Sequence, residues 1–322
     1  MYCRKIQRDE KFWNNYNYPA INNEANSLEK LYSVSTNPAT YGLTSANTWD
    51  SLSSTNAYIS GLMSGQKWGA IDPDDSTTTE LKYYIYGDAG PEDLGYDYTP
   101  SSSGNDTGQP PDAAEATAMS NAMGAFAEVA NLTFTSTSNK NDAHIAWAML
   151  DNDDSGGYLG FAYYPGDDPH LAGSLTTVNN TSYDLTANPN SLQPGAYYYL
   201  TFTHELGHAV GLKHPHDTAA GIYDVFPGVT NGSDGGDNNL NATPWTVMTY
   251  NDSAASNGLT PGDYGDNGYL MNLGAFDIAA VQYLYGPNLS ANSGDTTYTL
   301  DSSLTGYKSI WDAGGTDLID AS

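Results

Sequence analysis

The sequence predicts an α+β (mixed α/β) fold, in which a twisted mixed sheet packs against two long helices and short strands follow. Two long segments, 113–130 and 197–210, have apolar residues at helical spacing, and strand-like apolar runs lie between them. The composition agrees with a folded domain. The 322 residues are 39% hydrophobic and only 15% charged, which allows a sizeable core and argues against disorder over most of the length.

The predicted elements follow in chain order. A short helix is expected within 50–65, and strands over 81–86, 132–135, 144–150, 158–164 and 175–179. The first long helix starts after Pro111-Asp112 and repeats small or apolar side chains at helical spacing: Ala114, Ala118, Met119, Ala122, Phe126 and Val129. A last helix over 276–284 ends near Gly286-Pro287.

Composition divides the chain into three parts. Residues 1–45 hold five of the 10 positive charges and are predicted to be an N-terminal tail or pro-segment. Residues 46–287 are expected to form the main domain, and 288–322 consist of short strands and Asp/Gly turns. Cys3 is the only cysteine, so an internal disulfide is excluded.

The charge balance excludes two classes of partner. Lys and Arg number 10 and Asp and Glu 38, which gives a net charge of −28. Such a chain cannot build the large basic face that nucleic acid or an anionic membrane requires. No segment approaches the roughly 18 apolar residues of a membrane span, and the first residues lack the apolar core of a secretory signal peptide. We therefore expect no nucleic-acid partner, no membrane insertion and a monomer.

The most informative stretch is 203–215, THELGHAVGLKHP, because it places three histidines at metal-ligand spacing. His204 and His208 are four residues apart, so on a helix they face the same ion. Gly211 can adopt a positive φ and end that helix, so that the chain turns back and brings His214 to the ion. Three imidazoles with one open position are typical of one catalytic Zn²⁺.

Glu205 follows the first predicted ligand and is expected to act as the general base. It can hold a metal-activated water, take its proton and pass that proton to the leaving amine. Half of the six histidines lie within eleven residues at these offsets, so a chance arrangement of solvated histidines is a poor alternative. The presence of Glu205 also disfavours a zinc-binding pseudoenzyme. Of the other histidines, His144 is expected to be packed, and His170 and His216 solvated.

The HExxHxxGxxH pattern resembles that of the metzincin metalloproteases, and 247–250 resembles their methionine-containing turn. Pro215 after the third histidine and Tyr250 two residues after Met248 resemble the serralysins, which are secreted bacterial proteases. The resemblance implies that Tyr250 is a further, displaceable zinc ligand that stabilises the oxyanion. It also implies that Met248 packs beneath the histidines without binding metal. Thr249 departs from the serralysins, which commonly have Ser there.

The resemblance extends over about 50–322. Residues 59–69 resemble the serralysin entry segment, 276–286 the closing helix and 311–317 the start of the calcium-binding β-roll. The chain stops at Ser322, before any GGxGxD repeat. The resemblance therefore implies a metzincin catalytic domain followed by the beginning of a truncated roll.

The resemblance also implies two further sites. One or more structural Ca²⁺ ions would bind seven residues, Asn292, Gly294, Thr296, Asp312, Gly314, Gly315 and Asp317. Oxygen ligands from two loops suit calcium, although a plain acidic turn and Asp295 as a ligand are alternatives. The substrate would pair by main-chain hydrogen bonds with an edge strand formed by Gly160, Phe161, Ala162 and Tyr163. An ordinary interior strand is the alternative there.

These features predict a secreted, extracellular zinc endopeptidase that hydrolyses peptide bonds in proteins. One alternative is a latent zymogen, in which residues 1–45 fill the cleft and Cys3 or another group caps the zinc. Another alternative is a calcium-dependent adhesin or binding module with an inactive metalloprotease-like domain. Loss of proteolysis on substituting Glu205 would separate the enzyme from the binding module.

Overall fold

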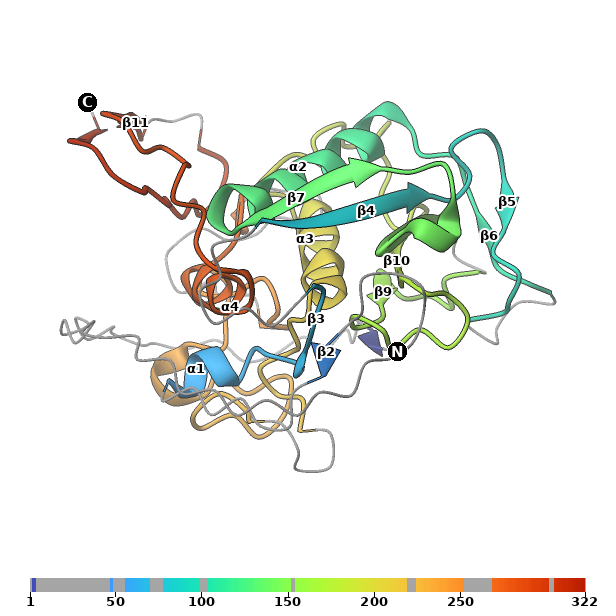
Figure 1. The fold of residues 1–322 in the computed structure, drawn as a ribbon, viewed down its shortest axis with the longest axis horizontal. Coiled ribbons are helices and arrows are strands. Elements are labelled where there is room, and N and C mark those ends of the chain that lie inside the picture. The colour runs from blue at the N-terminus through green and yellow to red at the C-terminus, as the bar shows by residue number, and fades with distance from the viewer. Residues whose placement is uncertain are drawn as a thin grey trace.

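The computed structural model describes residues 2–3, 47–48, 56–69, 78–98, 104–151, 154–218, 224–251, 268–300 and 304–321. Most of the predicted tail, 4–45, and part of the predicted first helix, 50–55, lie outside the described residues. The rest forms a sheet with helices on one side, and the C-terminal segment extends away from it (Figure 1).

A six-stranded mixed sheet forms the centre of the molecule, with the order β1-β9-β10-β8-β4-β7. Its strands are β1 (Tyr2–Cys3), β4 (Thr79–Ile85), β7 (Leu132–Ser136), β8 (Ile145–Leu150), β9 (Gly160–Ala162) and β10 (Ser174–Asn179). Neighbouring strands from β10 to β7 are parallel, whereas β9 is antiparallel to both β10 and β1. The mixed sheet is confirmed.

The two long helices, α2 (Ala113–Val129) and α3 (Tyr197–Ala209), pack against this sheet, and each boundary lies within one residue of the prediction. The α2 helix keeps exposed residues on one side, whereas nearly every residue of α3 is buried. The α2 helix begins with a capping box, in which Asp112 accepts from the backbone N–H of Glu115 and the Glu115 carboxylate accepts from that of Asp112. Phe126, Trp147 and Phe202 are fully buried in the core between helices and sheet.

The remaining elements are shorter than the two long helices. They are the helices α1 (Ala57–Ser60) and α4 (Ala275–Tyr285), the 3₁₀ turns η1 (Lys140–Asp142) and η3 (Asp237–Asn239), and the strands β2 (Asn47–Thr48), β3 (Gln66–Lys67), β5 (Glu92–Asp93), β6 (Thr107–Gly108), β11 (Thr297–Thr299) and β12 (Leu318–Asp320). The β11 and β12 strands pair in parallel at the C-terminal end. No described helix is long and apolar enough to cross a membrane.

Two predicted elements are shorter in the structure. The strand expected over 158–164 pairs regularly only over β9. Tyr163 still donates its backbone N–H to the Leu175 carbonyl, 3.1 Å away. The helix expected within 50–65 is described only as the single turn α1, after which the chain extends into β3.

Candidate metal centre

The C-terminal end of α3 presents the first two predicted ligands and is fixed by side chains from outside the helix. His204 and His208 both lie on α3 and are fully buried. The Trp68 indole donates to the Ala209 carbonyl at 2.8 Å, and the Tyr285 hydroxyl donates to the Val210 carbonyl at 2.8 Å. These bonds satisfy carbonyls that a helix end leaves without partners, so the last turn is held in place.

Gly211 follows the helix with a φ of 104°, so the positive φ predicted for this residue is present. A Cβ at this position would collide with the Gln66 carbonyl oxygen. The chain then runs beside the entry segment, 59–69. The Ser64 N–H donates to the Gly211 carbonyl at 2.9 Å, and the Lys213 N–H donates to the Leu62 carbonyl at 2.7 Å. This pairing fixes the return path to the third histidine.

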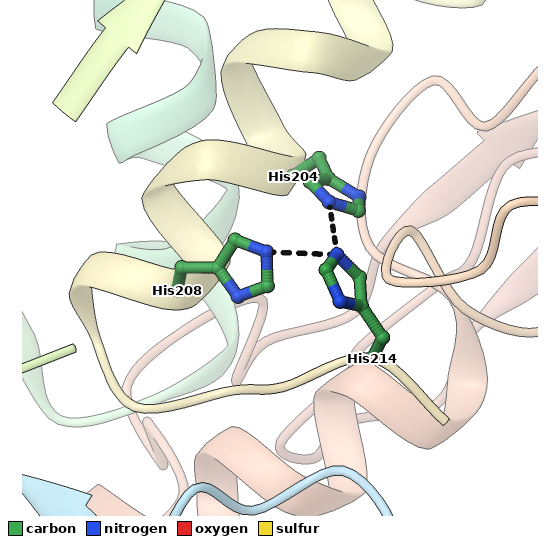
Figure 2. Close-up of side chains that lie close together, drawn as sticks. All are labelled: His204, His208 and His214. Atoms are coloured by element: carbon green, nitrogen blue, oxygen red, sulfur yellow. Dashed lines mark hydrogen bonds between the residues drawn. The ribbon is translucent and has the colours of Figure 1, made fainter. Parts of the chain in front are cut away.

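His214 thereby meets the two helical histidines, and the three rings converge through one nitrogen each (Figure 2). Its Nε2 lies 3.1 Å from the Nε2 of His204 and 3.1 Å from the Nε2 of His208. Ligands around a tetrahedral zinc at about 2.05 Å are roughly 3.3 Å apart. The three nitrogens therefore have the separations of a zinc ligand set.

The opposite nitrogen of each ring identifies the tautomer. His204 Nδ1 lies 2.7 Å from the Val247 carbonyl, His208 Nδ1 lies 2.9 Å from the Leu212 carbonyl, and His214 Nδ1 lies 2.8 Å from Asp217 Oδ2. Each partner is only an acceptor, so each Nδ1 carries the proton. Three Nε2 lone pairs then face one another, an arrangement that a cation between them stabilises.

Burial favours the neutral imidazoles that metal binding requires. It lowers the pKa of His208 to about 4, so this ring is unprotonated at neutral pH without any bound ion. The chemistry of the three residues and their positions therefore fit a zinc ion. The three histidines that the sequence spacing predicted to share one ion do lie together in the structure.

Glu205, the predicted general base, lies on α3 directly beside the predicted substrate strand. Its side chain is fully buried. A Cβ added to Gly160 of β9 would lie 2.9 Å from the Glu205 Cγ and 3.0 Å from its Oε1. Glycine at 160 therefore lets the backbone of the strand approach the carboxylate, which places the two predicted sites side by side.

The turn containing Met248 lies beneath the histidines, as the family resemblance implies. Met248 is fully buried, and a Cβ on Gly207 of α3 would lie 2.6 Å from its sulfur. The Tyr250 ring lies beside the metal centre, with its centroid 4.5 Å from that of His214 and 6.0 Å from that of His204. Glycine at 207 thus allows close packing between the helix and the turn.

Sequence reasoning missed two carboxylates that support the ligands. Asp217 accepts from His214 Nδ1, as described above. Asp277 of α4 accepts from the backbone N–H of Val247 at 2.7 Å, and the Val247 carbonyl in turn accepts from His204. The position of Asp217 three residues after His214 could have suggested its role, whereas Asp277 is distant in sequence. His144 is packed as expected, but His216 is half-buried against His214 rather than solvated.

Comparison with known proteins agrees with this geometry. Residues 97–234 match the matrixin family model. The chain is 32% identical over 216 residues to Metallopeptidase AprA of Pseudomonas marginalis and 33% identical over 213 residues to Serralysin B of Dickeya chrysanthemi. Over these regions the chain is similar to serralysin-type metzincins. The alignments cover 62% and 61% of this chain and 42% and 41% of those relatives.

A longer alignment relates the chain to Serralysin of Photorhabdus luminescens, at 27% identity over 268 residues. It covers 80% of this chain and 51% of the relative. The chain spans about half the length of the curated relatives that it matches.

The two segments predicted to bind calcium lie side by side in the structure. The Thr296 N–H donates to Asp317 Oδ1 at 3.0 Å, and the Asn292 amide donates to the Trp311 carbonyl at 2.9 Å. Several of the predicted oxygens bond to protein donors, including Asp312 Oδ1, which accepts from the Gly314 N–H at 2.8 Å. The structure therefore brings all seven predicted residues into adjacent segments, 292–296 and 312–317.

The predicted substrate strand is buried and paired on both sides. Gly160, Phe161 and Ala162 form β9, and Tyr163 follows it. The expected exposed edge is covered by β1, with Cα partners Tyr2↔Ala162 and Cys3↔Phe161. Without β1, β9 would be the edge strand of the sheet.

Proposed function

We propose that this chain is a zinc endopeptidase that hydrolyses peptide bonds in proteins. The observation that carries the proposal is the convergence of three Nδ1-protonated imidazoles beside a buried carboxylate. His204, His208 and His214 would hold the ion, which when bound polarises the scissile carbonyl and makes water a stronger acid. The names of the relatives, a metallopeptidase and a serralysin, support the same class of activity.

Glu205 would perform the proton transfers. Its carboxylate accepts a proton from the attacking water and delivers that proton to the amine that leaves. Because residue 160 is glycine, the backbone of β9 lies close to the carboxylate side chain, so the base lies beside the strand that would position the substrate. The Tyr250 phenol, beside His214, would donate a hydrogen bond to the oxyanion or bind the ion before substrate arrives.

The substrate would be an extended peptide that pairs with β9. A β-strand edge binds extended chains through backbone hydrogen bonds with little demand on their side chains. The β1–β9 pairing supports this mode, because it places an extended segment antiparallel to β9 at the required position.

A peptidase assay with matched variants tests this proposal. Glu205→Gln should lower cleavage of casein and of an internally quenched peptide by at least about 100-fold, because general-base catalysis contributes that much. Its zinc content, measured after gel filtration, should equal that of the parent protein. A chelator should abolish parental activity, and added zinc should restore it. Equal activity of parent and Glu205→Gln would reject the enzyme and favour the binding module.

A latent form is a second candidate, favoured specifically by β1. We propose that the N-terminal segment occupies the substrate position on β9 and blocks access until it is removed. Deletion of residues 1–45 should then raise peptidase activity sharply. Cys3→Ser separates two versions of latency: it leaves the block intact if backbone pairing is sufficient and releases it if a thiolate caps the ion. Unchanged activity of the deletion variant would reject latency.

We further propose that the chain is a secreted monomer with calcium bound at 292–296 and 312–317. Secretion rests on the resemblance to serralysins and on the strongly acidic composition. Calcium binding rests on the oxygen-rich residues that the two segments bring together.

A further inference from the structure

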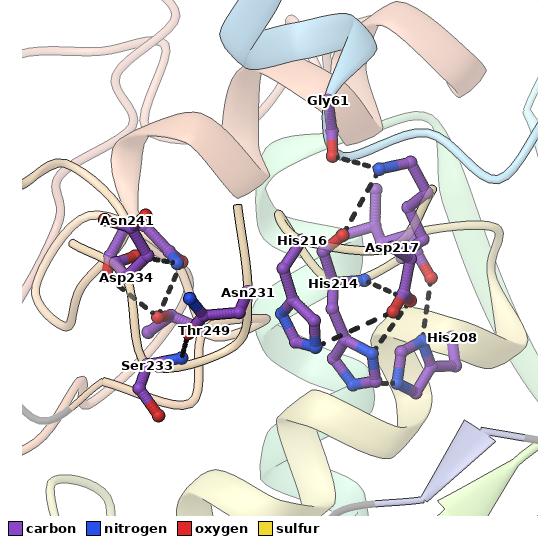
Figure 3. A network of polar contacts seen from close by, with 12 residues as sticks. Gly61, His208, His214, His216, Asp217, Asn231, Ser233, Asp234, Asn241 and Thr249 are labelled. Atoms are coloured by element: carbon purple, nitrogen blue, oxygen red, sulfur yellow. Dashed lines mark hydrogen bonds and ion pairs between the residues drawn. The ribbon is translucent and has the colours of Figure 1, made fainter. Parts of the chain in front are cut away.

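Two side chains beside the metal centre are not used by the proposed mechanism. His216 and Asp217 follow the third zinc ligand, and His214, His216 and Asp217 form a second cluster of metal-ligating groups (Figure 3). The two carboxylate oxygens of Asp217 face different histidines. Its Oδ2 accepts from His214 Nδ1 at 2.8 Å, whereas its Oδ1 faces His216 Nε2 at 3.7 Å. The second distance is too long for a hydrogen bond.

His216 is held tightly although its polar atoms are poorly satisfied. Its side chain is 17% exposed. Its ring stacks on that of His214 at 5.1 Å with an interplanar angle of 14°, and its centroid lies 5.0 Å from that of Tyr250. Its Nδ1 is buried and has no hydrogen-bond partner among the described residues. Because Nδ1 is buried, Nε2, which faces Asp217 Oδ1, is the ring nitrogen available to a metal ion.

The space around His216 Nε2 is kept open by glycine. A Cβ on Gly232 would lie 3.2 Å from this nitrogen. Two ligands on one tetrahedral zinc are separated by roughly 3.3 Å, so His216 Nε2 and Asp217 Oδ1 need to approach by only a few tenths of an ångström. An imidazole and a carboxylate oxygen are both ordinary ligands of Zn²⁺.

We propose that His216 Nε2 and Asp217 Oδ1 bind a second zinc ion, which inhibits the enzyme when zinc is in excess. This regulation rests on the proposed peptidase function. The second ion would lie beside Tyr250 and would share Asp217 with His214. It would therefore restrict the phenol that is needed for the oxyanion and weaken the support of a catalytic ligand. Solvent would complete its coordination shell.

Zinc stoichiometry tests the second position without reference to activity. Equilibrium dialysis at micromolar free zinc in excess calcium, which occupies sites made only of oxygen, should give two zinc ions for the parent chain. His216→Asn should bind one. His170→Asn changes an exposed histidine outside this cluster and should still bind two. Asp217 is left unchanged because it supports His214. Equal stoichiometry in parent and His216→Asn would overturn the proposal.

Inhibition is measured on the same samples with an internally quenched peptide. Parental activity should rise up to one equivalent of zinc and fall with excess. Inhibition is expressed for each protein relative to its own maximal activity. In His216→Asn the zinc concentration that inhibits should increase at least about tenfold, because one of the two ligands is lost. The same inhibitory concentration in both proteins would overturn the regulatory role. Two sites in the parent and one in His216→Asn, without cleavage by either, would refute the peptidase function and leave the second ion standing.

Discussion

At the scale of single residues, each histidine of the candidate metal centre is oriented by the group that its other nitrogen contacts. His204 and His208 donate to backbone carbonyls, whereas His214 donates to a side chain, Asp217. A carboxylate in this position orients the ring and raises its basicity toward a metal. The third ligand is therefore the one whose support a single substitution can remove.

Asp217→Ala should lower zinc affinity by roughly 10- to 100-fold, because His214 loses its acceptor and its fixed orientation. Competition with a chromophoric chelator measures the change. Asp217→Asn is the matched control. It keeps an acceptor oxygen but not the charge, and should lose less affinity than Asp217→Ala. Identical affinities for all three proteins would contradict the role assigned to this carboxylate.

Gly207 is a position of close approach between α3 and the methionine turn. Gly207→Ala should destabilise the protein by about 1–3 kcal/mol, because the added Cβ would lie 2.6 Å from the Met248 sulfur and force repacking. Gly124→Ala in the exposed part of α2 is the matched control, since nothing lies within 4 Å of its Cβ. That variant should be stabilised by about 0.4–1 kcal/mol. Urea unfolding of both variants measures the difference, and equal stability changes would refute this account of the packing.

The sequence was sufficient to predict the three candidate ligands, but not the residues that hold the site in place. His204, His208 and His214 occur at offsets that a helix followed by a glycine turn converts into one site, so local rules were enough. Gly160 and Asp277 act through contacts with residues more than 25 positions away. Such contacts depend on how the elements pack, which spacing in the sequence does not reveal.

At the scale of elements, Asp277 joins α4 to the methionine turn. It accepts from the Thr246 hydroxyl at 2.5 Å, from the Val247 N–H at 2.7 Å and from the Gly274 N–H at 2.8 Å. Burial raises its pKa to about 7, although these three hydrogen bonds oppose the shift. One side chain therefore holds the start of α4 and the turn that supports His204.

This raised pKa makes the stability of the protein depend on pH. Between about pH 4 and pH 7 the folded carboxyl group holds a proton that the unfolded one has lost, so its contribution to the free energy of unfolding falls as pH rises. Asp277→Asn keeps the acceptor oxygen and can donate to Thr246, but it does not titrate. Urea unfolding of the metal-free proteins across this range should show a smaller decrease for the variant. Parallel pH profiles would contradict the shift.

The element boundaries show which local rules were reliable. The helices α2 and α3 were predicted within one residue, because their apolar spacing and the Asp112 cap act within the segment itself. The strand over 158–164 was predicted too long. Its apolar pattern continues to Tyr164, but regular pairing with β10 ends at Ala162. Tyr163 and Tyr164 are buried although they lie beyond the regular ladder, so the apolar pattern is longer than the strand.

At the scale of the whole molecule, the C-terminal segment contacts the rest less closely than the sheet and helices do. Leu318 and Ile319 of β12 are 57% and 62% exposed. The β11–β12 pair therefore lacks a core of its own, and bound calcium would hold 292–296 against 312–317.

Removal of calcium should therefore loosen this end selectively. Chelation with a calcium-specific reagent should increase hydrogen exchange at 292–320 while leaving α3 protected, because α3 is buried in the core. Restoring calcium should reverse the change. Asp312→Asn combined with Asp317→Asn is the matched variant and should behave as the chelated parent does. Exchange that is independent of calcium would reject the proposed site.

The global arrangement was predicted only as a class. An α+β domain with a mixed sheet followed from the order of helices and strands, but the order β1-β9-β10-β8-β4-β7 did not. The pairing of β1 with β9 joins residues about 160 positions apart in the sequence, and no local pattern marks it. Long-range pairing is decided by which edge is available once the rest has folded.

The contacts between the entry segment and the chain after α3 have a consequence for how an ion would be lost. Lys213 is completely buried, and its ammonium group donates to the Gly61 carbonyl at 2.6 Å and to the His214 carbonyl at 3.2 Å. The third imidazole therefore cannot swing away while 61–64 stays in place. We expect detachment of this short stretch to loosen the backbone of His214 and thereby to speed the dissociation of a bound ion.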